Sequence, residues 1–373
     1  MATYVAEALN DPSKFFKVQL YTGDGNTGRS ITFDDTDTDM QPDMLWIKRR
    51  DATEGHVLFD AVRSADARLQ PNTNGAEGDR PNIVYSFNSD GFSISEAGID
   101  NASNNDGGTY VAWAWKAGTS FTNDASATSI GSIDSSGSAS SDAGFSIVSW
   151  TGNDSDATIK HGLSTAPQIY ILKNRADAAD WRVAQTVAGN IMTGGNGYYM
   201  ELNDTKGSTN PGSAVTWGST PTAPTSSVFT VGSHNSHNGN GDSFIAYCWH
   251  SVQGFSKIGG YTGNGNVDGS FVYTGFRPAF IMIKQHDADG TDWTILDNKR
   301  PAENPADQWI APNTNAAEVA NDTTALSADL LSNGFKLRGS ASDGTNGSSD
   351  DFIYMAFAEA PFVNSNGVPC NAR

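Results

Sequence analysis

Three short sequence motifs recur three times along this chain, always in the same order. The first motif is an apolar run that ends in an aromatic residue, threonine and glycine, and its aromatic residues are Tyr21, Trp150 and Tyr261. Motifs that return in a fixed order indicate one structural unit that has been copied. The sequence therefore predicts three copies of a unit of about 100 residues.

The second motif is a proline, a mostly apolar run and a lysine, found at Pro42–Lys48, Pro167–Lys173 and Pro278–Lys284. Proline is tolerated at the first residue of a strand, where no ladder donor is lost. A nearly continuous apolar run predicts a strand that is buried on both faces. The first and third copies are the more similar pair, because Pro71–Glu77 also matches Pro312–Glu318.

The third motif is an apolar strand that closes each copy. Its three occurrences are Tyr110–Trp115, Phe244–Trp249 and Phe352–Phe357. Alternate positions are bulky on one face and mainly small on the other, which is the period of a strand. We expect the bulky face to pack across a β-sandwich core. Trp115, Trp249 and Phe357 are then predicted to occupy equivalent core positions.

Composition supports an all-β fold. Glycine accounts for 39 of the 373 residues, and Ser, Thr, Asn and Asp crowd between short apolar runs, which is the turn chemistry of many short strands. The 10% of aromatic residues exceeds what a disordered chain would carry. The predicted fold is three tandem β-sandwich repeats of the jelly-roll or lectin-like type.

The motifs also predict domain boundaries. We expect an N-terminal arm (1–14), a first repeat (15–116), a linker or edge segment (117–143), a second repeat (144–249), a third repeat (255–358) and a C-terminal tail (359–373). Two interpretations of 117–143 stay open: a flexible Ser/Gly-rich linker, or an edge segment in which Ser129–Ile133 pairs as a strand. Only His250–Gly254 separates the last two repeats. These two are expected to form the rigid pair, with proteases cutting first in 117–143.

The formal net charge of −19 argues against nucleic acid and anionic membranes as partners. No segment reaches the 18 or so apolar residues of a membrane helix. The N-terminal residues lack the basic start and apolar stretch of a signal peptide, so we expect synthesis in a cytoplasm without membrane insertion. Cys248 and Cys370 have no metal-ligand spacing and are expected to be free thiols.

Catalytic motifs are not found, and we predict that the protein is not an enzyme. The six histidines occupy no equivalent repeat positions, and the Gly-x-Ser-x-Gly elbow of hydrolases is missing. Asp35, Asp37 and Asp39 alternate like calcium ligands but lack the later glycine and glutamate, so a calcium site competes with a plain acidic turn. No other cofactor is expected. Trp217 and Trp309 are the aromatic loop residues that best fit a binding role.

The three motifs together resemble a repeat module of structural proteins in marine tailed bacteriophages, over nearly the whole chain. The resemblance implies a virion surface protein that is assembled in the host bacterial cytoplasm, and it carries over no catalytic residue. Three roles stay open: a tail-appendage adhesin of the fibre or knob type, a capsid-decorating knob, or a polysaccharide-cleaving tail enzyme. The implied partners are other tail or capsid proteins and a host-surface glycan or protein receptor. Self-association, for example as a trimer, is a habit of phage appendages.

Overall fold

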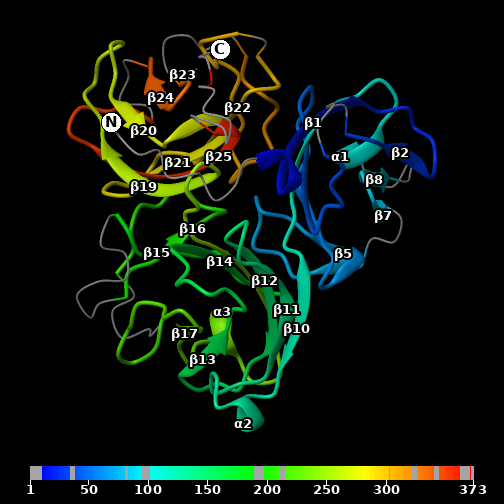
Figure 1. The fold of residues 1–373 in the computed structure, drawn as a ribbon, viewed down its shortest axis with the longest axis vertical. Coiled ribbons are helices and arrows are strands. Elements are labelled where there is room, and N and C mark those ends of the chain that lie inside the picture. The colour runs from blue at the N-terminus through cyan, green and yellow to red at the C-terminus, as the bar shows by residue number, and fades with distance from the viewer. Residues whose placement is uncertain are drawn as a thin grey trace, which may run out of the picture.

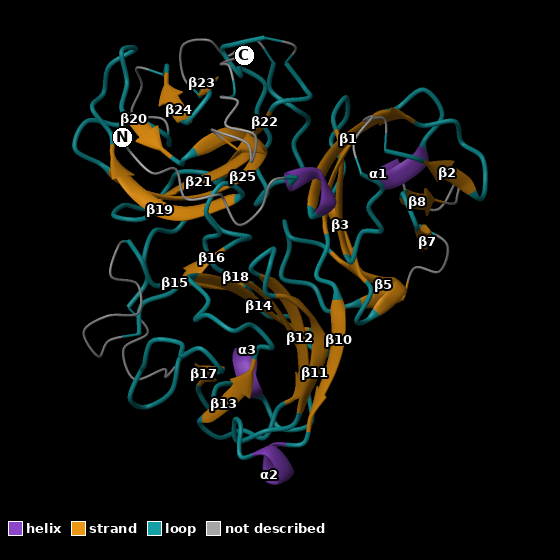
Figure 2. Ribbon diagram, in the orientation of Figure 1, coloured by secondary structure: helices purple, strands orange, loops and turns teal. Residues whose placement is uncertain are grey.

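The computed structural model describes residues 11–33, 38–79, 83–94, 101–188, 197–210, 216–301, 303–320, 326–339, 344–361 and 370. Within these residues the chain is all-β with antiparallel sheets, as predicted (Figure 2). The short helices are η1 (Pro12–Lys14), α1 (Asn101–Asn104), α2 (Ala125–Thr128) and α3 (Asn235–Asn238). None of the helices in these ranges has the length and apolar character needed to cross a bilayer.

The strands form three lobes around a common centre (Figure 1). Each lobe contains a large sheet and a smaller sheet with a hydrophobic core between them. We name them the N-terminal lobe (residues 11–116), the middle lobe (117–250) and the C-terminal lobe (251–361).

The N-terminal lobe has a large sheet of order β1-β9-β3-β4-β5-β6 and a small sheet of order β2-β8-β7. Its strands are β1 (Phe16–Thr22), β2 (Arg29–Ile31), β3 (Met44–Arg49), β4 (Val57–Asp60), β5 (Ser64–Leu69), β6 (Gly78–Asp79), β7 (Val84–Asn88), β8 (Gly91–Ile94) and β9 (Thr109–Trp115).

The middle lobe has a large sheet of order β10-β11-β12-β18-β14-β15-β16 and a small sheet of β13 and β17. Its strands are β10 (Thr119–Asn123), β11 (Ser135–Ser140), β12 (Phe145–Thr151), β13 (Ala157–Lys160), β14 (Ile169–Asn174), β15 (Arg182–Gln185), β16 (Met200–Glu201), β17 (Val228–Val231) and β18 (Ser243–Trp249).

The C-terminal lobe has a large sheet of order β19-β25-β21-β22 and a small sheet of order β20-β24-β23. Its strands are β19 (Ser256–Thr262), β20 (Phe271–Tyr273), β21 (Phe276–Gln285), β22 (Thr294–Asp297), β23 (Ala328–Leu331), β24 (Gly334–Leu337) and β25 (Asp351–Pro361). Strand β25 continues to Pro361, beyond the expected repeat end at 358, because Ala358–Pro361 stay paired with the start of β21.

The three large sheets share one order of strands. The strand of the third motif (β9, β18 or β25) lies between the strand of the first motif (β1, β12 or β19) and that of the second (β3, β14 or β21). A hairpin partner of the second-motif strand, β4, β15 or β22, follows in each sheet. Each set of three motifs therefore assembles the middle of a large sheet.

The bulky face of the third motif does not face the small sheet of its own lobe. Trp115, Trp249 and Phe357 meet in one central cluster that all three large sheets enclose. The ring centroid of Trp115 lies 6.4 Å from that of Trp249 and 5.6 Å from that of Phe357. All three side chains are buried as expected, but the prediction that this face packs inside a sandwich is wrong, because it packs between the lobes.

The small face of the third motif forms the core within each lobe. Ala112 and Ala114 pack there with Phe92, which the small sheet supplies from β8. Phe229 and Phe335 have the same role in the other two lobes. The alanines leave the volume that these rings fill, so the small residues are needed for packing against the second sheet.

The first motif needs its glycine because the backbone of another loop of the same lobe lies very close to it. A Cβ at Gly23 would lie 2.0 Å from the carbonyl oxygen of Asn105, and at Gly152 and Gly263 it would lie 2.2 Å from a carbonyl oxygen. Any side chain would push the two loops apart.

Residues 117–143 form an edge segment of the middle sheet. Strands β10 and β11 pair with each other, and β11 also pairs with β12. Of the two interpretations of this segment, the flexible linker is wrong. The strands differ from the one expected, because Ser129–Ile133 lies between α2 and β11 and forms no strand.

Candidate functional site

The lobes meet at three junctions, and each junction contains a ring N–H that donates to a backbone carbonyl of the next lobe. Trp181 Nε1 of the middle lobe donates to Gln70 O of the N-terminal lobe at 3.1 Å. Trp293 Nε1 of the C-terminal lobe donates to Glu201 O of the middle lobe at 2.9 Å. We call these the first and second junctions.

At the third junction, between the C-terminal and N-terminal lobes, a histidine takes the place of the tryptophan. His56 Nε2 lies 3.1 Å from Ala311 O, while its Nδ1 accepts a hydrogen bond from Trp46 Nε1 at 2.8 Å. These partners require the neutral ring with its proton on Nε2. Burial, and secondarily the charge of Lys48, lower the pKa of His56 from 6.5 to about 3.

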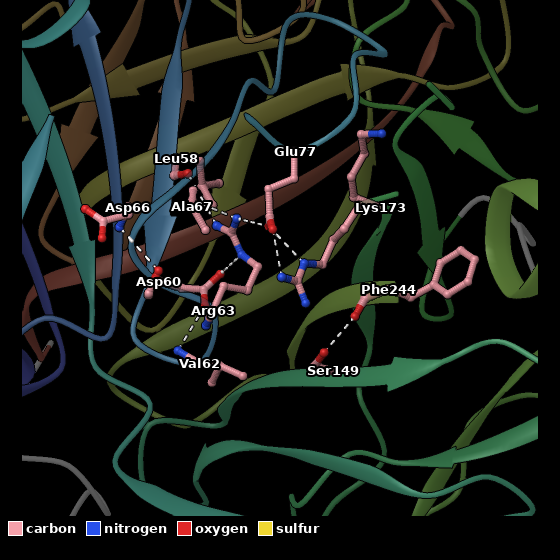
Figure 3. A network of polar contacts seen from close by, with 12 residues as sticks. Leu58, Asp60, Val62, Arg63, Asp66, Ala67, Glu77, Ser149, Lys173 and Phe244 are labelled. Atoms are coloured by element: carbon pink, nitrogen blue, oxygen red, sulfur yellow. Dashed lines mark hydrogen bonds and ion pairs between the residues drawn. The ribbon is translucent and has the colours of Figure 1, made fainter. Parts of the chain in front are cut away.

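A carboxylate between two guanidinium groups closes the first junction (Figure 3). Glu77 accepts from Arg63 of its own lobe at 2.8 Å, and from Arg175 of the middle lobe at 2.7 and 2.8 Å. Burial alone would raise the pKa of Glu77, but Arg175 and Arg63 outweigh it and hold that pKa below its usual value. The bidentate geometry fixes the relative orientation of the two lobes.

The third junction repeats this arrangement. Glu318 accepts from Arg50 at 2.9 and 3.0 Å and from Arg300 at 3.2 Å. The two junctions also share a backbone hydrogen bond between lobes. Glu77 N donates to Arg175 O at 2.9 Å at the first junction, and Glu318 N donates to Arg50 O at 2.8 Å at the third. The two junctions are therefore built by corresponding residues.

Each of these triads is anchored in the centre of the molecule. Asp60 Oδ2 accepts from Arg63 Nε at 2.6 Å and from the hydroxyl of Tyr247 in the middle lobe at 2.6 Å. Asp297 Oδ2 accepts from Arg300 Nε at 2.7 Å and from Trp113 Nε1 in the N-terminal lobe at 3.0 Å. These buried charges are thus paired and hydrogen-bonded, as burial demands.

The lysine that ends each second motif is buried and holds loops by donating to carbonyl oxygens. Lys173 Nζ donates to Asn174 O at 2.6 Å and to Asn74 O of the N-terminal lobe at 3.3 Å. Lys284 Nζ donates to Thr205 O of the middle lobe at 3.1 Å. Burial lowers the pKa of Lys48, Lys173 and Lys284 to about 8. These lysines are structural.

The second junction has the same backbone hydrogen bond between lobes as the other two junctions, but smaller side chains. Ser208 N donates to His286 O at 2.7 Å, which places Ser208 where the other junctions have Glu77 and Glu318. His286 stands in the place of the arginine that follows the second motif. Gln185 caps the next turn, as Asp60 and Asp297 do, by accepting from Val187 N and Ala188 N. Ala188 therefore replaces the central arginine.

An open cavity of about 390 Å³ lies at this second junction. Its walls are Ala188, Gly260, Tyr261, Thr262, His286, Asp351 and Phe352. Burial lowers the pKa of His286 below 6.5, although Asp287 and Asp351 act in the opposite direction. His286 is therefore mainly neutral near pH 7, and its Nδ1 lies 3.4 Å from Ser208 Oγ.

A second feature is an exposed aromatic strand in the C-terminal lobe. Phe271 and Tyr273 of β20 are 48% and 60% exposed, and nearby Val267 is 55% exposed. Val272 between them points into the core and pairs with Phe335. This strand presents two aromatic side chains to solvent from one face, because residues i and i+2 of a strand point the same way.

The corresponding strands of the other lobes carry polar residues at these places. Ile31 pairs with Phe92 and Ile159 pairs with Phe229, just as Val272 pairs with Phe335. That register aligns the aromatic pair of β20 with Ser30 and Thr32 in one lobe, and with Thr158 and Lys160 in the other. The fold does not require aromatic residues here, so their exposure makes this strand a candidate binding surface.

The predicted site residues lie elsewhere. Trp217 is buried, and its Nε1 donates to Tyr198 O at 3.0 Å. It lies in the wall of a separate pocket of about 330 Å³, together with Asp156 and Ser219. Trp309 is half-buried and packs against the C-terminal core, and its backbone pairs with Val319. Neither tryptophan belongs to the cavity or to the exposed strand.

The candidate calcium ligands are only partly placed. Asp35 and Asp37 lie outside the described residues, and Asp39 is exposed. Across the described ranges, no group of three or more His, Cys, Asp or Glu side chains has a metal-binding arrangement.

Sequence reasoning missed both candidate surfaces, although each left a signal. Phe271-Val272-Tyr273 is apolar at all three positions, whereas the aligned segments alternate polar and apolar residues. For the cavity, the signal is that the second copy lacks the Pro-to-Glu segment shared by the other two. Both signals require an alignment of the copies with one another.

Comparison with known protein families gives one match. A family model described as "Domain of unknown function (DUF7483)" matches residues 11–361. The match covers all three lobes as a single domain. A search of curated proteins finds no match.

Proposed function

The chain belongs to the DUF7483 family, and we propose that it is a non-enzymatic surface protein of a bacteriophage virion. In its most specific form the proposal is a tail-appendage adhesin that contacts a receptor on the host cell. Three tandem β-sandwich units would act as a rigid body that carries the receptor-binding surface.

The observation that carries the proposal is the exposed aromatic pair on β20. Phe271 and Tyr273 replace polar residues of the sister strands and leave about half of each side chain in water. Exposed aromatic side chains of this kind bind sugars and proteins by stacking and by burying apolar area. A host-surface glycan or protein would cover them.

The similarity of the lobes supports the tandem-unit part of the proposal. Corresponding residues at the first and third junctions make the same contacts, although one junction joins neighbouring lobes and the other joins the two ends of the chain. Head-to-tail interfaces that close on themselves form rings. Such a ring would hold the aromatic strand in a fixed position.

The virion location rests on the three motifs and on charge. Their resemblance to modules of marine tailed phages extends over nearly the whole chain. A net charge of −19 suits a surface that must stay soluble in salt water, where screening weakens self-repulsion.

The test of adhesion is the double variant Phe271→Ser/Tyr273→Thr, which copies the residues of the N-terminal lobe. It should fold with an unchanged melting temperature and bind host cells at least about tenfold more weakly, since hot-spot aromatics typically contribute 2 kcal/mol or more. The matched control is Ser30→Ala/Thr158→Ala on the sister strands, which should bind normally. Equal binding by both variants would contradict an adhesin that uses β20.

Location is tested by labelling virions with an antibody to this chain and imaging them in negative stain. Labels on the tail agree with the adhesin. Labels on the capsid would replace it with the decoration role. Release of reducing sugars from host polysaccharide by the purified chain would contradict the non-enzymatic assignment.

A further inference from the structure

We propose that the cavity at the second junction is a binding site for a small polyhydroxylated ligand without negative charge, that is, a neutral or amino sugar. This site is separate from the exposed strand β20. Its existence does not depend on adhesion through that strand.

The first argument is the comparison among the three junctions of the same chain. Two of them are filled by an arginine, a glutamate and a second arginine, which lock the lobes together. At the second junction these positions hold Ala188, Ser208 and His286, and a cavity of about 390 Å³ lies there. The second junction therefore lacks the ion pairs of the arginine–glutamate–arginine triad, and the volume of its cavity falls within the size range of ligand pockets, about 300–1,000 Å³.

The second argument is the chemistry of the walls. Thr262 Oγ1 donates to Asp351 Oδ1 at 2.7 Å, which fixes the orientation of a carboxylate that is exposed and can accept hydroxyl protons. His286 adds a neutral imidazole. Tyr261 and Phe352 also line the cavity, but their rings stack on each other in the C-terminal core, on the opposite face of β19 and β25 from Thr262 and Asp351. Oriented polar groups that can donate and accept are what a polyhydroxylated ligand needs.

The third argument is charge, which excludes acidic ligands. Asp351 lines the cavity, and Asp287 Oδ2 accepts from Asp351 N at 3.0 Å. Burial, together with the like charges of Asp287 and Asp351, raises the pKa of the neighbouring Asp350. The local potential is therefore negative, and a uronic or sialic acid would be repelled.

Saturation-transfer difference NMR with the full chain tests the proposal, using glucose, galactose, N-acetylglucosamine, glucosamine and glucuronate as probes. We expect saturation transfer to at least one neutral or amino sugar and none to glucuronate. Asp351→Asn and Thr262→Val should each weaken binding by about tenfold, because each removes a directed hydrogen bond. Thr22→Val, at the equivalent place in the N-terminal lobe, is the matched control and should bind like the parent.

A second variant closes the cavity with the residues of its sister junctions. Ala188→Arg/Ser208→Glu should abolish saturation transfer while circular dichroism shows the same β-sheet spectrum. If that variant does not fold, Asp351→Asn and Thr262→Val still decide the matter. Absence of transfer to every sugar, preferential binding of glucuronate, or unchanged binding by both cavity variants would overturn the proposal. None of these results would affect adhesion through Phe271 and Tyr273.

Discussion

Two buried histidines are held as neutral hydrogen-bond bridges. His56 connects Trp46 to Ala311, and His161 accepts from Leu163 N through Nδ1 while its Nε2 lies 3.1 Å from Thr225 O. Burial lowers the pKa of His161 from 6.5 to about 4. Protonation of Nδ1 would break an accepted hydrogen bond and bury a charge, so these residues couple folding to pH.

We therefore expect stability to fall as pH drops below about 6.5. The unfolded chain binds protons on histidine from about that pH, whereas folded His56 does not do so until about pH 3, so acid favours unfolding. His56 alone should contribute a loss of about 3 kcal/mol between pH 6.5 and pH 4. Urea melts across this range should show it.

The control is His56→Gln, whose amide can accept from Trp46 and donate to Ala311. Between about pH 4 and pH 6, unfolding of this variant should take up about one proton fewer than unfolding of the parent protein. An identical dependence in the parent and the variant would mean that His56 is already charged in the fold.

At the scale of elements, the segment 117–143 is secured by β11. This strand pairs on both sides, and a Cβ at Gly137 would lie 2.0 Å from Ile147 O of β12. Gly137→Ala should therefore force β11 away from β12, at a cost of about 1–3 kcal/mol. Subtilisin should cut 117–143 in the variant much faster than in the parent.

Gly78→Ala is the matched control, because nothing lies within 4 Å of a Cβ there. It should leave the cleavage pattern unchanged. Rapid first cuts within 117–143 of the parent protein would show that β10 and β11 open readily, as the linker interpretation required.

The motif strands could be predicted because the alternation of residue types that marks a strand lies within each motif itself. Trp113, Trp115 and the alanines between them specify a strand with two unlike faces. The partner of each face could not be predicted, because it depends on distant residues: Phe92 covers the alanines, and Phe357 covers Trp115. The Ser/Gly composition of 117–143 left two interpretations open for a similar reason, since small residues suit a close strand approach as well as a flexible linker.

The candidate site was beyond prediction for a related reason. Ala188 and His286 are nearly a hundred positions apart, and neither belongs to a catalytic or metal-binding motif. Their importance lies in what the corresponding positions of the other lobes contain, namely Arg63 and Arg175 at the first junction. Only the folded arrangement identifies those positions as corresponding.

At the scale of the whole molecule, stability is shared among the lobes. Trp115 lies at the centre, in contact with rings from the middle and C-terminal lobes. We expect one cooperative unfolding transition, and Trp115→Ala should lower the free energy of unfolding by about 3–5 kcal/mol while keeping that single transition. Urea melts followed by fluorescence and by circular dichroism should coincide. Two separated transitions, or a loss below about 1 kcal/mol, would show that the lobes unfold independently.

The contact between Phe16 and Phe357 brings together the beginning and the end of the described chain, with ring centroids 5.1 Å apart. Nearby, Arg50 and Glu318 form the same pair as Arg175 and Glu77, although 268 positions separate them. The contacts thus follow a cyclic order that does not depend on where the polypeptide starts. A circular permutant that opens between Ser251 and Gly254, with a short peptide joining Pro361 to Asp11, would offer every lobe the same neighbours.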